Sequence, residues 1–361
     1  MIRLERRPQP SRAVVWMTPV LAVLLTVAAG MVLFAILGVD PVRAVGIIFL
    51  SPFSDAYSLS ELIVKATPLI LIGVGLSLGF RAGVWNIGAE GQFVIGALTG
   101  GAVALAFYDI SGVWLLPLMS LAAIAGGMAW AAVPAFLRTR FGTNEILVSL
   151  MLTYVAILLL SAMVTGPLRD PDGFNFPESR IFHDSALMPP LFEQGRANVG
   201  FLVALAAAAT GWILLGRHVV GFQIRLMGQS PRAARFAGFR EKRIIWFCLM
   251  VSGGLAGLAG VFEAAGPVEQ LVPALPAGYG FTAIIVAFLG RLNPIGIVLA
   301  GFVIAVTYIG GEAAQIQMQL PAAVTRVFQG MLLFFLLGMD LLAGFRFRLR
   351  LPRRANVVET P

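Results

Sequence analysis

Long apolar runs, separated by short polar segments, dominate the hydrophobic pattern of the chain. A helix needs about 20 apolar residues to cross the hydrocarbon core of a bilayer. Ten windows meet or approach this length, and the eighth is short; they lie near 14–38, 62–80, 87–107, 113–137, 146–166, 198–216, 244–265, 275–290, 295–311 and 322–342. The pattern predicts an all-α fold, a polytopic membrane helix bundle of about ten transmembrane helices with broken or re-entrant segments.

Composition strengthens this interpretation. Of the 361 residues, 58% are hydrophobic and 12% are charged, and the mean hydropathy is +0.88. Soluble domains carry about 25% charged residues. We therefore expect one transmembrane domain over residues 1–361, embedded in the lipid bilayer. The single cysteine, Cys248, excludes a disulfide framework and a thiolate metal cluster.

The positive charges follow membrane topology and not a nucleic-acid site. The formal net charge is +8, but the basic residues lie in short flanks between apolar windows and form no single patch. With ten crossings and a cytoplasmic N-terminus, 20 of the 26 Lys and Arg residues fall on the cytoplasmic side, as the positive-inside rule requires. We expect both termini in the cytoplasm, with tails at 1–13 and 343–361, and no nucleic-acid partner.

Two polar loops are longer than a turn. The loop on the outer side, about 167–197, is long enough to bind a partner or to contain its own short helix. The cytoplasmic loop, 217–243, contains a helix signal, because Ser230 can cap a helix, Pro231 can occupy its first position and Gly238 can end it.

This short cytoplasmic helix is predicted to be amphipathic and basic. It exposes Arg232 and Arg235, and its alanines share the opposite side with Phe236. A membrane-surface helix held by anionic headgroups fits this pattern. So does a docking helix that enters a groove of a soluble partner.

A polar break at residues 85–92, WNIGAEGQ, lies between two membrane windows. An ionisable side chain at bilayer depth costs about 2.5 to 3.5 kcal/mol on insertion scales, so it should face protein, water or a ligand. Asn86, Glu90 and Gln92 offer donors and acceptors suited to hydroxyls and ring nitrogens, and they are candidates for a substrate path. The alternative is that Asn86 and Glu90 pair with backbone N–H groups or with Arg81 and stabilise the break.

Further polar residues near the membrane windows extend the candidate path. Asn144 and Tyr154 belong to the fifth window and its start, and Glu263 lies near the outer end of the seventh. Four aromatic residues are able to stack on a base, although membrane aromatics more often pack or anchor at the interface; they are Trp85, Tyr154, Phe262 and Tyr279.

Several segments, in order along the chain, resemble a known family. Residues 80–92 look like its NIGxEGQ signature, 142–156 are similar to its xxNEVIxTIMLNYIA pattern, and 228–238 resemble its GxNPxAAxYAGI coupling segment. The family comprises permease subunits of bacterial ABC importers for simple sugars and nucleosides, in the branched-chain amino acid and ribose permease superfamily. The first motif is that of the nucleoside-type branch. Thr153 and Phe236 depart from the family pattern, where Asn and Tyr are common.

The resemblance implies a transport subunit of an ATP-driven importer, with no catalytic residues and no cofactor of its own. A P-loop ends in Gly-Lys-Ser/Thr, and the only lysines, Lys65 and Lys242, lack that context. ATP is therefore expected to be hydrolysed by a separate ATPase subunit. The residues expected to couple to that ATPase are Ser230, Pro231, Arg232, Ala233, Ala234, Arg235 and Gly238.

The resemblance also implies further partners and a location. We expect a second, related permease forming a heterodimer, an extracytoplasmic substrate-binding protein, and the bacterial cytoplasmic (inner) membrane. Nucleosides are the expected substrates, and a simple sugar such as ribose or galactose is the alternative.

Two other classes of function fit the sequence less well. An ion-coupled secondary transporter needs a chain of buried acids or histidines, and only Glu90 lies deep in a window. A membrane enzyme needs a constellation for metal or nucleophile chemistry. His183 and His218 lie in different loops, so no metal site is expected.

Overall fold

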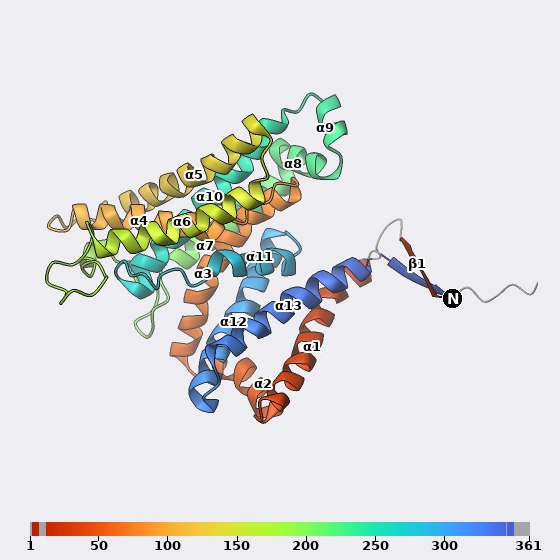
Figure 1. The fold of residues 1–361 in the computed structure, drawn as a ribbon, viewed down its shortest axis with the longest axis horizontal. Helices are drawn as coiled ribbons and strands as arrows, with labels where there is room; N and C mark the ends of the chain where they lie inside the picture. The colour runs from red at the N-terminus through yellow and green to blue at the C-terminus, as the bar shows by residue number, and fades with distance from the viewer. Residues whose placement is uncertain (1, 7–11, 344, 350–361) are drawn as a thin grey trace, which may run out of the picture. The chain divides into compact units, whose positions relative to one another are not determined.

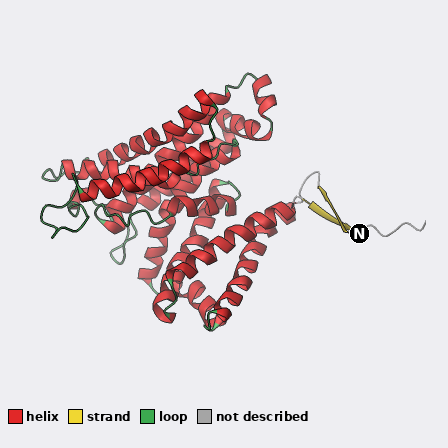
Figure 2. Ribbon diagram, in the orientation of Figure 1, coloured by secondary structure: helices red, strands yellow, loops and turns green. Residues whose placement is uncertain are grey.

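The computed structural model describes residues 2–6, 12–343 and 345–349, and helices dominate them (Figures 1 and 2). The helices are α1 (Arg12–Ile36), α2 (Pro41–Leu50), α3 (Ala56–Arg81), α4 (Ala89–Ala106), α5 (Leu115–Phe141), α6 (Glu145–Thr165), α7 (Gly200–Arg217), α8 (Val219–Gln229), α9 (Pro231–Phe236), α10 (Glu241–Glu263), α11 (Tyr279–Leu289), α12 (Pro294–Met318) and α13 (Ala322–Ala343). Among the described helices, nine are long and apolar enough to cross a membrane. The all-α membrane fold predicted from hydropathy is confirmed. Residues 1, 7–11, 344 and 350–361 of the expected tails lie outside the described residues.

The described chain forms two compact units. One comprises Met1–Val45 and Arg326–Pro361. Within it, Gly30 of α1 meets the ring of Phe328 of α13, and strand β1 (Ile2–Arg6) pairs antiparallel with β2 (Phe345–Leu349). The strands were not foreseen, because hydropathy windows detect only long apolar helices.

The other unit, Gly46–Thr325, contains the residues predicted to be functional. Helices α4, α5 and α10 pack against one another, and α3 is buried along most of its length. Glycines permit the closest approach, since a Cβ on Gly96 of α4 would collide with the backbone of Gly257 of α10. Small residues let membrane helices pack in this way, which fixes α4 against α10.

Helix α11 corrects the eighth predicted crossing. Its 11 residues span about 16 Å at the α-helical rise, whereas the hydrocarbon core is about 30 Å thick. Residues 275–290 are therefore not a complete membrane helix. The expectation of broken or re-entrant segments is met here, because an extended segment leads into a half-length helix.

Hydrogen bonds show how this segment still joins the two ends of the unit. The backbone N–H of Leu271 donates to Ser179 Oγ at 2.9 Å, in the 167–197 loop. Some 20 residues later, the carbonyl of Leu292 accepts from Arg81 Nε at 2.9 Å, and Arg81 lies against Gly228 in the other loop. The extended segment and α11 together therefore connect the 167–197 loop with the end of α3.

Candidate functional site

The centre of the larger unit is a break between α3 and α4. Helix α3 ends at Arg81, residues 84–87 are not helical, and α4 begins at Ala89. Asn86 in the break meets Ser252, which lies 11 positions after the first residue of α10. That separation is about 16 Å along the helix axis. The chain therefore returns into the bundle before α4 starts, and α4 begins well inside the bundle.

Side-chain amides close this break. Asn86 Nδ2 donates to Gln92 Oε1 at 2.7 Å and to Ser252 Oγ at 2.9 Å, while Asn86 Oδ1 accepts from Gln92 Nε2 at 3.1 Å and from the N–H of Gly88 at 3.2 Å. Asn86 is 2% exposed, and Gln92 and Ser252 are each 1% exposed. Freed backbone at membrane depth is stable only where protein pairs it or water reaches it. Here protein groups pair part of it, because Asn86 accepts from the N–H of Gly88 and Glu145 accepts from the N–H of Trp85 at 3.3 Å.

Glu90 joins the break to α11. One of its carboxyl oxygens accepts from the N–H of Gly278 at 2.8 Å and the other from the N–H of Gly280 at 2.5 Å. Gly278 has φ +85° and stands directly before the first residue of α11. The first N–H groups of a helix have no partner within it, and an acid is favoured there by the helix dipole. Glu90 therefore caps α11, in line with the alternative that it pairs with backbone N–H groups.

A second polar group lies beyond the start of α11. The Tyr279 hydroxyl donates to Glu263 Oε1 at 3.2 Å, and both side chains are buried. Lys65 Nζ lies 5.7 Å from the centroid of the Tyr279 ring. Thr282 Oγ1 and Tyr308 Oη, one turn further along, are 2.9 Å apart. Glu263 thus takes part in a paired cluster between α3, α10 and α11.

Aromatic rings cover the accessible side of the break. The Trp85 ring stacks on Phe288 of α11 with centroids 6.0 Å apart and planes at 26°, and Phe80 stacks on Phe288 at 5.3 Å. Trp85 keeps 38% of its surface exposed, whereas Tyr279 is fully buried. Trp85 is thus the aromatic residue of the break that can contact a ligand. Phe288 was missed, because a phenylalanine in an apolar run gives no separate signal.

The remaining two path candidates lie on α6. Asn144 caps the helix, its Oδ1 accepting from the N–H of Ile146 at 2.9 Å. Tyr154 is 57% exposed on the outside of α6. Within the described chain, no hydrogen bond joins either residue to the Asn86 cluster or to Glu90. The structure thus groups Asn86 with Gln92 and links Glu90 and Glu263 to α11, but leaves Asn144 and Tyr154 apart.

An ion pair missed by the sequence interpretation fastens the 167–197 loop. Arg196 donates from its Nε and its terminal nitrogen to the two carboxyl oxygens of Glu61, at 2.9 and 2.6 Å. The partnership raises the pKa of Arg196 above its ordinary value. The loop also contains a short 3-10 helix, Asp184–Ala186, as its length suggested. No local sequence signal could predict the pairing of Glu61 with Arg196, because 135 residues separate them.

The segment at residues 217–243 has the predicted helix. Ser230 caps α9, with its Oγ accepting from the N–H of Ala233 at 3.4 Å; Pro231 is the first helical residue, and Gly238 follows the helix with φ +79°. Ala234 is 4% exposed and faces the bundle. Helix α9 stands at one end of the larger unit beside α8 (Figure 1).

The predicted amphipathic division of α9 is wrong at two positions, because Ala233 and Phe236 are both exposed. Arg232 and Arg235 are exposed as expected. Phe236 is not packed with the buried alanine but is 94% exposed. A six-residue helix makes fewer than two full turns, so Ala234 alone covers its inner side.

These features define a class of protein. Broken helices whose ends meet inside a bundle of membrane spans are typical of transporters. Residues 58–337 match the family described as branched-chain amino acid transport system / permease component, and the chain belongs to that family. The resemblance seen in the sequence motifs is confirmed.

Three relatives indicate the position of the chain within this family. It is 38% identical to the glucose ABC transporter permease protein TsgB13 of Haloferax volcanii, over 98% of this chain and 97% of the relative. It is 30% identical to the guanosine ABC transporter permease protein NupP of Bacillus subtilis, over 88% and 92%. A second guanosine permease of that organism, NupQ, is 28% identical over 65% and 75%. The chain is thus similar to ABC permeases for both sugars and nucleosides.

Proposed function

We propose that this chain is the permease subunit of an ATP-driven importer of nucleosides or simple sugars in the bacterial cytoplasmic membrane, with both termini in the cytoplasm. The observation that carries the proposal is the similarity to TsgB13 over nearly the full length of both chains. The distribution of the basic residues supports this orientation, because 20 of the 26 fall on the cytoplasmic side when ten crossings are assumed.

The proposed importer contains a second, related permease. The chain is similar both to NupP and to NupQ, two guanosine permeases of one organism. Two related but distinct subunits in one organism support a heterodimer, with this chain as one half. A substrate-binding protein on the outer side would deliver the substrate to the 167–197 loop, which the Glu61–Arg196 pair holds in place.

A separate ATPase subunit would dock on α9 and hydrolyse the ATP, so that this chain needs no cofactor. Arg232 and Arg235 present exposed guanidinium groups, and Phe236 presents an exposed ring. An aromatic anchor flanked by arginines is typical of the residues that dominate binding at protein interfaces. Ser230, Pro231, Ala233, Ala234 and Gly238 would shape the helix that carries them.

The substrate path would pass the exposed face of the break. The Trp85 ring, backed by Phe288, offers a surface for stacking a base or the apolar face of a sugar. Asn86, Glu90, Gln92 and Glu263 would hold the half-helices behind this surface, while Asn144 and Tyr154 would line the path from α6. The motif at 85–92 and the similarity to NupP favour a nucleoside. The higher identity to TsgB13 favours a sugar as the second candidate.

Uptake measurements in cells distinguish these substrates. We expect cells that carry the complete importer to accumulate labelled guanosine or labelled glucose, and to lose this uptake when the ATPase gene is deleted. Competition by unlabelled adenosine, ribose and galactose would assign the substrate class. Uptake that persists without the ATPase would contradict the proposal.

A matched pair of tryptophan variants tests the path. Trp85→Ala is expected to raise the KM for uptake about tenfold, because stacking on one aromatic ring contributes about 1 to 3 kcal/mol per base. Trp212→Ala is the control, since Trp212 on α7 is similarly exposed at 41% but contacts Arg217 and not the break. If both variants change the KM for uptake equally, Trp85 does not contact the substrate.

A further inference from the structure

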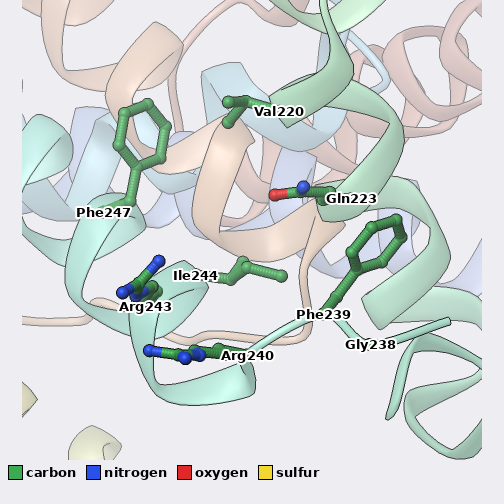
Figure 3. Close-up of a pocket in the computed structure, with 8 residues that line it drawn as sticks. All are labelled: Val220, Gln223, Gly238, Phe239, Arg240, Arg243, Ile244 and Phe247. Atoms are coloured by element: carbon green, nitrogen blue, oxygen red, sulfur yellow. The ribbon is translucent and has the colours of Figure 1, made fainter. Parts of the chain in front are cut away.

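A cavity of about 400 Å³ lies between α8 and the start of α10, in the segment that joins α9 to α10 (Figure 3). This volume is within the range of about 300 to 1,000 Å³ that small-molecule sites have. The residues that define its two ends are Val220, Gln223, Phe239, Arg240, Arg243 and Phe247.

The lining of the cavity changes from basic to apolar along α10. Arg240 and Arg243, both exposed, lie together at one end (Figure 3). Phe247 lies one turn further along α10, about 6 Å from Arg243 along the axis, and Val220 of α8 lies near it (Figure 3). Ile244 is 5% exposed and belongs to the core cluster that Phe247 and Val220 pack against. One end of the cavity is thus charged, and the other end is apolar and packed against the core.

The arginines of this cavity are not neutralised. Among the residues that the structure describes, no carboxylate lies within ion-pair distance of Arg240 or Arg243. Glu241, between them in sequence, lines two neighbouring cavities and not this one. The half-buried amide of Gln223 adds a neutral donor on the facing helix (Figure 3). The cavity therefore presents donors and positive charge to an anion.

In the orientation proposed above, on which this step rests, the cavity lies where a bilayer changes from headgroups to hydrocarbon. The apolar span that includes α10 begins at Glu241, so Arg240 and Arg243 mark the boundary and Phe247 lies on the hydrocarbon side. Basic pockets between membrane helices on the cytoplasmic side bind anionic lipid headgroups. Arginine suits a phosphate because its planar fork of donors matches two phosphate oxygens.

We propose that this cavity is a binding site for an anionic phospholipid of the cytoplasmic leaflet. Its phosphate would bind Arg240 and Arg243, the Gln223 amide would donate to a headgroup oxygen, and the first methylenes of an acyl chain would lie against Phe247 and Val220. An acidic segment of a soluble partner would satisfy the arginines but would leave the apolar end without a ligand. The site does not depend on which solute the protein transports.

Native mass spectrometry of the full-length protein tests this site. The protein would be delipidated and offered equal amounts of phosphatidylglycerol and phosphatidylcholine. We expect the wild type to retain phosphatidylglycerol, and the double variant Arg240→Gln/Arg243→Gln to retain it about tenfold less, since a charge-assisted hydrogen bond is worth about 1.5 kcal/mol or more. The control Arg232→Gln/Arg235→Gln removes the same charge from α9 and is expected to retain the lipid.

Three results would overturn the proposal. The first is equal retention by the wild type and the Arg240/Arg243 variant. The second is displacement of the lipid by millimolar inorganic phosphate, which would assign the cavity to a free anion. The third is loss of binding to the ATPase subunit by that variant with unchanged lipid retention, which would assign the cavity to a protein partner. Phe247→Ser keeps both charges, and its weaker retention would support contact with the acyl chain.

Discussion

Two polar segments of the larger unit look alike in sequence and differ in structure. The break at residues 85–92 and the segment at 228–238 are both short, contain glycine and lie between apolar helices. In the break, the side chains of Asn86, Glu90 and Gln92 are at most 2% exposed, and their hydrogen bonds stay within the protein. In the other segment, Arg232 and Arg235 are exposed to solvent.

The difference distinguishes polar residues that hold the fold together from polar residues that are available to bind a partner. A buried polar group must be paired within the protein, since leaving it unpaired costs about 1 to 3 kcal/mol. An exposed charge carries no such requirement, and it is available to a partner. The hydrogen bonds of Glu90 therefore indicate that it holds the half-helices together. Arg235 is exposed and stays available for the proposed docking, although both residues look equally unusual in an apolar chain.

The largest loss of stability is expected for Glu90→Ala. It leaves the N–H groups of Gly278 and Gly280 without their acceptor inside the bundle, which costs about 2 to 6 kcal/mol for two groups. Thermal unfolding of the purified protein in detergent, followed by size-exclusion chromatography, measures this loss. Glu90→Gln keeps one acceptor oxygen, and its stability is expected to lie between that of Glu90→Ala and that of the wild type.

An exposed acid provides the control for this loss. Glu193 lies at the surface of the 167–197 loop, and Glu193→Ala is expected to change stability by no more than about 0.5 kcal/mol. If the Glu90→Ala protein is as stable as the Glu193→Ala protein, the buried hydrogen bonds of Glu90 do not stabilise the fold, and the contrast between the buried and the exposed segment is wrong.

A smaller loss is expected for Asn86→Ala. The Gln92 amide and the N–H of Gly88 lose their partner, but hydrogen bonds between neutral groups are weaker than those to a carboxylate. A double-mutant cycle with Gln92→Ala sharpens the measurement. Residues in one hydrogen-bond network couple by about 0.5 to 3 kcal/mol, so the double variant should lose less than the sum of the single variants. Strict additivity would show that the two amides act independently.

More of the fold than of the candidate site could be predicted from the sequence. Nine of the ten predicted windows coincide with described helices that are long and apolar enough to cross a membrane, because a lipid-facing helix must be apolar over its full length. The cap at Ser230 and the end at Gly238 were also predicted, since both signals are local. Local signals do not reach further than this. At residues 275–290 hydropathy predicts a crossing, but the helix found there, α11, is too short to cross a membrane.

Pairings between distant residues could not be predicted. Glu90 meets Gly278 across 188 positions, and Asn86 meets Ser252 across 166. Hydropathy and periodicity carry no information about which buried polar groups meet, since a helix that is apolar all round has no preferred face. The exposure of Phe236 was missed for a related reason, because six residues are too few to define an apolar face.

A local effect is expected for Ser230→Ala. Loss of a side-chain cap costs about 0.5 to 2 kcal/mol of helix stability. Ser230 caps α9, so this variant should destabilise α9 alone. Hydrogen exchange of the amides at 231–236 should accelerate, while global unfolding stays unchanged. Ser230→Asn keeps a capping oxygen and should exchange like the wild type. Unchanged exchange in Ser230→Ala would mean that the cap does not stabilise α9.

The smallest change in stability is expected for Arg235→Glu, within about 0.5 kcal/mol, because the side chain is exposed. Binding of the ATPase subunit should nevertheless fall at least about tenfold, since reversing a charge at an interface puts like charges together. Co-purification of the ATPase measures this. Arg169→Glu, on the loop at the other end of the unit, is the control, and normal ATPase binding by Arg235→Glu would remove α9 from the docking surface.

Reconstituted transport tests the central claim most directly. The permease would be placed in proteoliposomes with its ATPase subunit, its second permease and the substrate-binding protein, and uptake of labelled guanosine and glucose would be followed. The account predicts that uptake requires ATP and all of these subunits. Uptake by this chain alone, driven by an ion gradient without ATP, would contradict it.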